Sequence, residues 1–296
     1  MRIGYNQSRR YRHLQWLCHK YKIKRCLDWE GKMKASVNEI QDKSKSRYPV
    51  GMTSVTFREK TISEIVDIAC AAGISHIEWG ADRHIPPHDK GAASEAVSLM
   101  ERHGLSCPSY GSYYRIGDGD LTAFRQICET ARMLGASVVR TWLGRAGSGE
   151  TPPEKRESLL AETRCLADIA AGYSLTLAFE FHGGTLNDNG EASVAFIRAC
   201  GRDNIKTYWQ PLAFGNSEEN LRAVLPWLCT VHVFNWDSEY RRYPLVEAKD
   251  RWRRYVEIVK SGDASSCPFL LEFVPGDSDE QFIMDAETLK DILYER

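Results

Sequence analysis

Leu175–Asn189 reads LTLAFEFHGGTLNDN and joins a buried strand to a polar strand end. Its first residues are mostly apolar, as in a strand covered on both faces of a parallel sheet. Glu180 and His182 lie two residues apart at the strand's end, so they project to the same side. A Gly-Gly pair and an Asn/Asp-rich run then end the strand. Carboxylate and imidazole together indicate either a metal or proton-transfer site, or an ion pair that only stabilises the strand end.

Strands of this kind alternate with amphipathic helices from Met52 onward. The predicted strands are TSVTF (53–57), SHIEW (75–79), LSCPSYG (105–111), SVVRTW (137–142), LTLAFE (175–180), NIKTYWQ (204–210), TVHVFN (230–235) and PFLLEFV (268–274). A helical stretch follows each, and the eight strand–helix units fit the ~250 residues of a (β/α)8 barrel. A doubly wound open sheet is the alternative, but it usually carries a GxGxxG turn, and none occurs here. We therefore predict an α/β fold, a single-domain (β/α)8 TIM barrel over residues 52–296.

The first 51 residues differ in charge from the rest of the chain. They hold thirteen Lys/Arg and four Asp/Glu, a net charge of +9, whereas residues 52–296 carry −10. A basic arm that binds nucleic acid or a membrane surface is one interpretation, and a targeting segment is another. We prefer a dispensable extension or a misassigned start, because the regular pattern begins only at Met52.

Composition and cysteine usage predict an ordinary globular protein. The chain is 43% hydrophobic and 27% charged, and no apolar run approaches the ~20 residues of a membrane helix. Its nine cysteines include no CxxC pair and are scattered mainly through apolar segments. This usage indicates reduced thiols in a cytoplasmic setting.

Polar side chains stand at the predicted carboxyl ends of the strands, where the active sites of (β/α)8 barrels lie. Glu272 is a lone carboxylate in FLLEFV, and a buried charge is costly unless it is paired or binds a metal. His232 in VHVF is similar, although a single buried histidine is more often a core residue than a ligand. Because Glu180, His232 and Glu272 converge on one barrel mouth, we interpret them together as functional. The other candidates at strand ends are Glu78, His84, Tyr113, Arg115, Arg140, Trp142, His182, Gln210 and Asn235.

Several stretches give the chain a resemblance to the xylose isomerase-like superfamily of TIM barrels. They are IEWGADRHIPP (77–87), YGSYYRIG (110–117), EFHGGT (180–185), TYWQP (207–211), VHVFNW (231–236) and LLEFV (270–274). The superfamily includes sugar isomerases, ketose 3-epimerases and the apurinic endonuclease. The chain resembles a bacterial subgroup described as sugar phosphate isomerase/epimerase, and the resemblance extends from Met52 to the end.

This resemblance implies a metal site on strands five to eight. The epimerases hold a divalent ion with Glu, Asp, His and Glu, and the matching residues are Glu180, Gln210, His232 and Glu272. Gln210 departs from the pattern, since an amide oxygen can bind a hard cation but brings no negative charge. We therefore expect weaker metal binding. Mixed oxygen and imidazole ligands do not choose among Mn²⁺, Mg²⁺, Co²⁺ and Zn²⁺. The family's histidine shortly after strand six has no match in PLAF (211–214).

The activity implied is that of a sugar or sugar phosphate isomerase or epimerase. Glu180 and Glu272 would move a proton next to a carbonyl, and the metal ion would stabilise the enediolate. The remaining strand-end candidates would contact the substrate, and the planar forks of Arg140 and Arg115 suit a phosphate.

Two other functions are alternatives to a sugar isomerase or epimerase. An endonuclease of the superfamily needs a three-zinc cluster, but only His84, His182 and His232 stand near strand ends, and the barrel is acidic. A non-catalytic sugar-binding barrel without its metal is the second alternative, favoured by Gln210. We expect a small carbohydrate as ligand, no nucleic acid and no membrane contact. A homodimer is compatible with such barrels.

Overall fold

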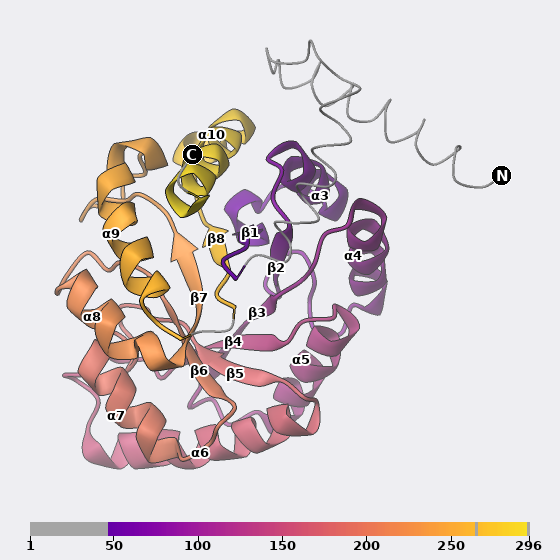
Figure 1. The fold of residues 1–296 in the computed structure, drawn as a ribbon. Coiled ribbons are helices and arrows are strands. Elements are labelled where there is room, and N and C mark those ends of the chain that lie inside the picture. Colours follow the sequence, from indigo (N-terminus) through magenta and orange to yellow (C-terminus); the bar gives the residue numbers. More distant parts are fainter. Residues whose placement is uncertain (1–46, 264–265, 295–296) are drawn as a thin grey trace, which may run out of the picture.

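The computed structural model describes residues 47–263 and 266–294, which form a closed barrel of parallel strands inside a ring of helices (Figure 1). The strands are β1 (Val50–Thr53), β2 (His76–Gly80), β3 (Ser109–Ile116), β4 (Val138–Leu143), β5 (Thr176–Phe179), β6 (Ile205–Trp209), β7 (Leu228–Val233) and β8 (Phe269–Leu271). Neighbours in sequence pair in parallel, and β8 pairs with β1 to close the barrel. The predicted (β/α)8 fold is confirmed.

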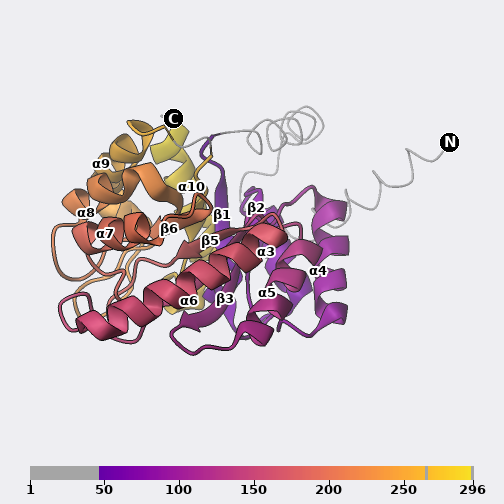
Figure 2. The ribbon, with the colours of Figure 1, turned by 90° about the horizontal axis from the view of Figure 1, so that it is seen from below.

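One α-helix follows each strand along the chain. The helices are α3 (Ile62–Ala71), α4 (Lys90–His103), α5 (Leu121–Met133), α6 (Pro153–Gly172), α7 (Gly190–Cys200), α8 (Ser217–Val224), α9 (Lys249–Lys260) and α10 (Asp279–Tyr294). Figure 2 shows α3, α4, α5 and α6 side by side outside the strands. Polar caps fix where several helices begin. Thr61 and Glu64 form a capping box at α3, and the side chains of Asp89 and Asp120 accept backbone N–H groups at α4 and α5.

The first predicted strand was misplaced. Strand β1 begins at Val50, upstream of the expected boundary at Met52, and Ser54–Phe57 is a 3₁₀ turn. The hydroxyl of Ser54 accepts a hydrogen bond from the Gly80 amide at 2.9 Å. The hydroxyl of Thr56 accepts one from the Phe273 amide at 3.2 Å. Such side-chain bonds to backbone groups outweigh the strand preference of a β-branched run.

The third strand also differs from the prediction, because it runs over Ser109–Ile116 rather than ending at Gly111. Pro108 has no N–H to donate to the ladder, so regular pairing starts after it. A register shift between Gly111 and Arg115 lets the strand continue. Tyr113 lies in this irregularity with a φ of 57°.

The predictions about the basic extension, the cysteines and membrane helices can be compared with the structure only for the residues that it describes. The basic extension falls almost wholly on residues 1–46, outside the described residues, so its role stays a prediction. The seven cysteines in the described ranges are all free thiols. No helix of the described residues is long and apolar enough to cross a membrane.

The interior of the barrel holds an ionic network in place of the branched apolar side chains usual there. Arg140 on β4 is 2% exposed and forms ion pairs with Glu78, through Nε at 3.0 Å, and with Glu180. The other oxygen of Glu78 accepts hydrogen bonds from Ser109 (2.6 Å) and Tyr208 (2.7 Å). Burial opposes ionisation of Glu78, but the positive charge of Arg140 and the nearby imidazole of His232 outweigh it. They lower the pKa of Glu78 to about 2.

Gly111 makes room for this network. A Cβ atom there would lie 2.5 Å from Nη2 of Arg140 and 3.1 Å from Oε1 of Glu78. The ring of Tyr113 covers the guanidinium from the other direction, with its centroid 4.8 Å from Cζ. The guanidinium thus contacts two carboxylates, the backbone at a glycine and an aromatic ring.

Far from this network, Asp285 on α10 joins the last helix to the segment before α9. Its Oδ1 accepts hydrogen bonds from the Leu245 amide at 2.9 Å and from Nε2 of Gln281 at 2.8 Å. The residue is only 4% exposed. Burial raises the pKa of Asp285 to about 6, although the two hydrogen bonds lower it in part.

Replacing Arg140 by Leu should lower the free energy of unfolding by ~3–5 kcal/mol, because Glu78 and Glu180 stay buried without a cation. The control Arg145→Leu breaks an exposed ion pair with Asp118 and should cost ~0–1 kcal/mol. Denaturant unfolding in the presence of a chelator measures both. Adding Glu78→Gln to Arg140→Leu should recover part of the loss. Equal costs for the two single variants would contradict a structural role for the network.

Asp285→Asn should stabilise the protein at pH 8 and lose that advantage by pH 4. The folded protein binds this proton more tightly than the unfolded chain, so Asp285 favours the fold below the unfolded pKa near 4. That contribution is lost as the pH rises through about 6. Asn keeps the acceptor and never ionises, so we expect a gain of ~1–3 kcal/mol at pH 8. Unfolding measured across this pH range would contradict the assignment if the difference between the two proteins stayed constant.

Candidate functional site

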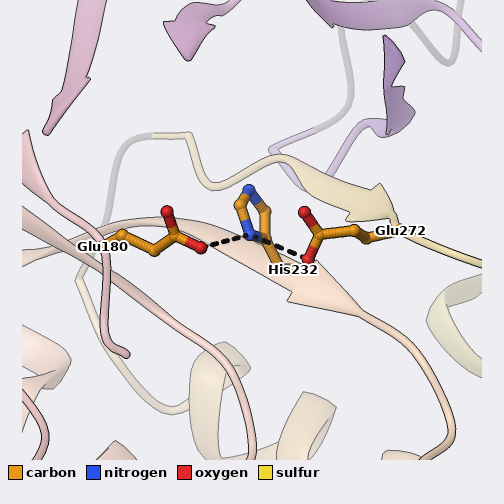
Figure 3. A group of neighbouring side chains, drawn as sticks. All are labelled: Glu180, His232 and Glu272. Carbon is orange, nitrogen blue, oxygen red and sulfur yellow. Dashed lines mark ion pairs between the residues drawn. The ribbon is translucent and has the colours of Figure 1, made fainter. Parts of the chain in front are cut away.

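Four side chains from neighbouring strands meet at the carboxyl end of the barrel. Glu180 follows β5, Gln210 follows β6, His232 lies in β7 and Glu272 follows β8. The Nδ1 atom of His232 lies 3.2 Å from Oε1 of Gln210, 3.4 Å from Oε2 of Glu272 and 3.9 Å from Oε1 of Glu180. Figure 3 shows Glu180 and Glu272 reaching toward His232 from opposite sides. The structure thus brings together the four residues that the resemblance implied, which we call the Glu/Gln/His/Glu cluster.

The donor atoms of this cluster fit a divalent cation. A ligand atom from each of Glu180, His232 and Glu272 lies within 4.8 Å of the others, and the amide oxygen of Gln210 adds a fourth donor. Bonds of ~2.0–2.2 Å to one ion place ligand atoms ~3–4 Å apart, which matches the separations from His232. All three residues are buried, so metal binding would compensate charge that is otherwise costly.

Residues below the cluster orient its ligands. One oxygen of Glu180 accepts hydrogen bonds from Arg140 and from Nε1 of Trp142, which leaves the other oxygen facing His232. On the far side of His232, Nε2 lies 3.6 Å from Glu78. A carboxylate behind the imidazole of a metal-binding histidine is a common arrangement that holds the ring in place. Glu78 is 1% exposed and lies beneath the cluster rather than at its open face.

Burial and neighbouring charges move the pKa values of the cluster in different directions. Burial disfavours ionisation of Glu180, but Arg140 outweighs it and lowers the pKa of Glu180. Burial raises the pKa of Glu272, against the opposing charge of His232. Burial disfavours the imidazolium of His232, yet Glu272 and Glu78 outweigh it and raise its pKa. The two carboxylates that face each other across His232 therefore differ in how readily they hold a proton.

A cavity of about 420 Å³ opens beside the cluster. His182 and Gln210 are among the residues that line it. The ring of His182 stacks on Trp142 with centroids 4.8 Å apart, and its Nδ1 lies 2.6 Å from the carbonyl oxygen of Gly183. The lining also includes Phe214, Phe234, Trp236, Tyr240 and Arg251. The volume suits a small molecule held between aromatic walls.

The other residues predicted to bind substrate have partners within the fold. Arg115 donates to the Gly144 carbonyl at 2.9 Å, and its guanidinium covers the ring of Trp142. His84 lies against the Lys60 carbonyl at 3.1 Å and is 7% exposed. Asn235 donates to the Pro244 carbonyl at 2.9 Å. Their contact with substrate stays a prediction, and these bonds give each a role in holding loops at the barrel mouth.

Arg251, Phe214 and Trp236 line the cavity but were absent from the sequence-based candidates. Arg251 lies in α9 in the run KDRWRRYVEIVK (249–260), whose basic residues repeat as on an ordinary solvated helix face. Phe214 lies in the loop after β6, where only its exposed ring, 52% accessible, distinguishes it. Trp236 directly follows the predicted strand TVHVFN, so extending the strand-end candidates by one residue would have included it.

Comparisons with known proteins agree with this fold. The probable 3-DHS dehydratase AsbF of Bacillus anthracis superposes with a TM-score of 0.71 at 15% identity over 82% of this chain and 98% of its own. D-allulose 3-epimerase from Methylomonas sp. gives a TM-score of 0.67 at 15% identity over 83% and 98%. The IOLI protein with a binding zinc atom gives 0.68 at 16% identity over 83% and 98%. At these identities the likeness concerns the fold. A search of curated protein sequences gave no match.

The family model described as xylose isomerase-like TIM barrel matches residues 66–292, which is most of the chain and includes all four residues of the cluster. The chain belongs to the xylose isomerase-like TIM barrel family.

Proposed function

We propose that this protein is a divalent-metal-dependent isomerase or epimerase that acts on a small carbohydrate by proton transfer next to a carbonyl. The observation that carries the proposal is the convergence of Glu180, Gln210, His232 and Glu272 on one point at the barrel mouth. The family match and the epimerase among its structural neighbours support it.

The two carboxylates of the cluster lie on opposite sides of His232 (Figure 3). Of the four cluster residues, Gln210 lines the cavity, and His182 lines it as well. One carboxylate removes a proton from the carbon beside the carbonyl, and the other returns one to the opposite face or to the neighbouring carbon. Inversion of a carbon or interconversion of aldose and ketose follows from which carbon receives the proton.

Glu180, Gln210, His232 and Glu272 would hold the divalent ion. When bound, that ion supplies positive charge next to the carbonyl oxygen, where negative charge develops as the proton leaves. Arg140 and Trp142 hold Glu180 in one orientation, so its free oxygen keeps facing the reaction centre. Nδ1 of His182 lies against the Gly183 carbonyl, so its Nε2 is free to contact a substrate hydroxyl in the cavity.

The homodimer and the cytoplasmic setting remain predictions.

Purified protein should bind about one Mn²⁺ or Co²⁺ per chain, and Glu180→Gln and Glu272→Gln should each weaken binding at least ~10-fold, because each removes one negative charge next to the ion. Glu257→Gln, on the exposed face of α9, is the matched control and should bind like the wild type. Titration calorimetry measures the affinities. Wild-type protein that takes up no divalent metal would contradict the metal-dependent mechanism and favour a non-catalytic sugar-binding barrel.

Incubating the metal-loaded protein in D₂O with a panel of ketoses and aldoses tests the chemistry directly. Proton transfer next to the carbonyl should place solvent deuterium on one carbon of the substrate, which NMR detects even at equilibrium. We expect exchange in the wild type and in Glu257→Gln, and a loss of ~100-fold or more in Glu272→Gln, as for loss of a general acid or base. Exchange that persists in Glu272→Gln would contradict its proposed role.

Gln210→Glu should tighten divalent binding and destabilise the metal-free protein. The new side chain has nearly the same shape but adds a carboxylate to a buried cluster that already holds two. We expect affinity to rise ~10-fold or more, equivalent to ~1.4 kcal/mol. Thermal unfolding with and without Mn²⁺ should therefore show a lower melting temperature without metal and a larger increase with it. A variant that matches the wild type in both would show that Gln210 lies outside the metal's ligands.

A further inference from the structure

The cavity beside the cluster contains one fixed positive charge that no acid neutralises. Among its lining residues, only Asp237 and Arg251 are permanently charged at neutral pH. Asp237 is saturated: its carboxylate accepts from Nε of Arg241 at 2.7 Å, from the Tyr243 hydroxyl at 3.0 Å and from two backbone amides. Within residues 47–263 and 266–294, Arg251 forms no ion pair.

The guanidinium of Arg251 is nevertheless held in place. Its Nη2 donates to Oδ1 of Asn235 at 2.8 Å, and Asn235 in turn donates to the Pro244 carbonyl at 2.9 Å. Its Nε is buried and has no hydrogen-bond partner in the described part of the chain. Arg251 also borders a smaller hollow of about 210 Å³ where Glu247 and Asp250 lie, so the side without a free acid is the larger cavity. An anchored guanidinium with unused donors is a ready recognition group for an anion.

The arginines nearer the cluster are already engaged. Arg140 is enclosed between Glu78 and Glu180, and Arg115 is bonded to the Gly144 carbonyl and stacked on Trp142. Neither of them lines the cavity. This leaves Arg251, which the sequence did not single out, as the cation that the cavity presents.

Aromatic rings line the same cavity as Arg251. Phe234 and Trp236 lie with ring centroids 4.4 Å apart, and Phe214 and Tyr240 expose 52% and 69% of their surface. Phe214 packs over Gly183, where a Cβ atom would lie 3.2 Å from its ring. Flat apolar walls of this kind contact the C–H face of a sugar and leave charge recognition to the arginine.

We infer that the substrate is an anionic carbohydrate, whose phosphate or carboxylate binds Arg251 while its carbonyl end lies at the Glu/Gln/His/Glu cluster. This inference rests on the proposed function for the second half of the statement, whereas anion binding at Arg251 stands on the cavity alone. Phosphate and carboxylate share the chemistry that a guanidinium recognises, so the experiment includes both.

Calorimetric titrations of the metal-loaded protein with matched pairs test the inference. The pairs are D-fructose against D-fructose 6-phosphate and D-glucose against D-glucuronate, with inorganic phosphate as a simple anion. For at least one pair, the anionic member should bind the wild type ~10-fold or more tightly than the neutral one, as expected for charge-assisted hydrogen bonds. The pair that shows the preference identifies the anion.

Arg251→Gln keeps a hydrogen-bond donor for Asn235 and removes the charge. It should abolish the preference for the anionic sugar and leave binding of the neutral sugar and of Mn²⁺ unchanged. Arg254→Gln is the matched control, because Arg254 lies on the same helix and pairs with Glu218 at 3.0 Å. The control should keep the wild-type preference.

Three results would overturn the inference. They are equal binding of the neutral and anionic members of both pairs, no binding of any probe to the wild type, and a preference that survives in Arg251→Gln. The last would assign the anion to the metal ion itself. Repeating the titrations on metal-free protein separates this inference from the proposed function. If the preference depends on Arg251 but the protein shows neither metal binding nor deuterium exchange, the anion site is supported and the proposed isomerase activity is contradicted.

Discussion

The buried guanidinium of Arg140 is the group on which the rest of the site depends. It lies between Glu78 and Glu180 in the barrel interior, where burial alone would drive both carboxylates toward their neutral forms. Because Arg140 keeps them ionised, Glu180 presents one oxygen to the mouth of the barrel, and Glu78 presents one to Nε2 of His232. A residue of β4 thus sets the orientation of candidate ligands on β5 and β7.

This arrangement has a cost that the rest of the barrel must offset. Buried ion pairs seldom stabilise a fold relative to well-packed apolar side chains of the same size. Here Ser109 and Tyr208 occupy the second oxygen of Glu78, and Gly111 gives up a side chain to admit the guanidinium. Such polar packing in a place usually filled by Val, Ile and Leu is understandable if it serves a site that needs ionised carboxylates in fixed positions.

The sequence predicted the barrel because short apolar strands alternate with amphipathic helices, several of which begin at a polar cap. It also predicted Glu180, His232 and Glu272, since strand ends of parallel sheets meet at one edge. It could not predict that Glu78 and Arg140 lie in the barrel interior rather than at its mouth. The position of a side chain along the barrel axis depends on the stagger between strands, and the sequence of one strand does not specify that stagger. Arg251 was missed for another reason. It is one of three arginines in the first half of α9, with Arg253 and Arg254, and the sequence does not indicate which of them faces the cavity.

Gln210 and Arg251 both make the charge of the site less negative. Glu78 and Arg140 cancel each other's charge, so a divalent ion bound by Glu180, Gln210, neutral His232 and Glu272 would form a neutral site. An aspartate in place of Gln210 would leave that site with a net negative charge, which repels an anionic ligand in a cavity with low dielectric. A neutral cluster beside the cavity and an arginine without an ion-pair partner in its lining would together favour a negatively charged substrate. The amide that we expect to weaken metal binding would then contribute to substrate selection.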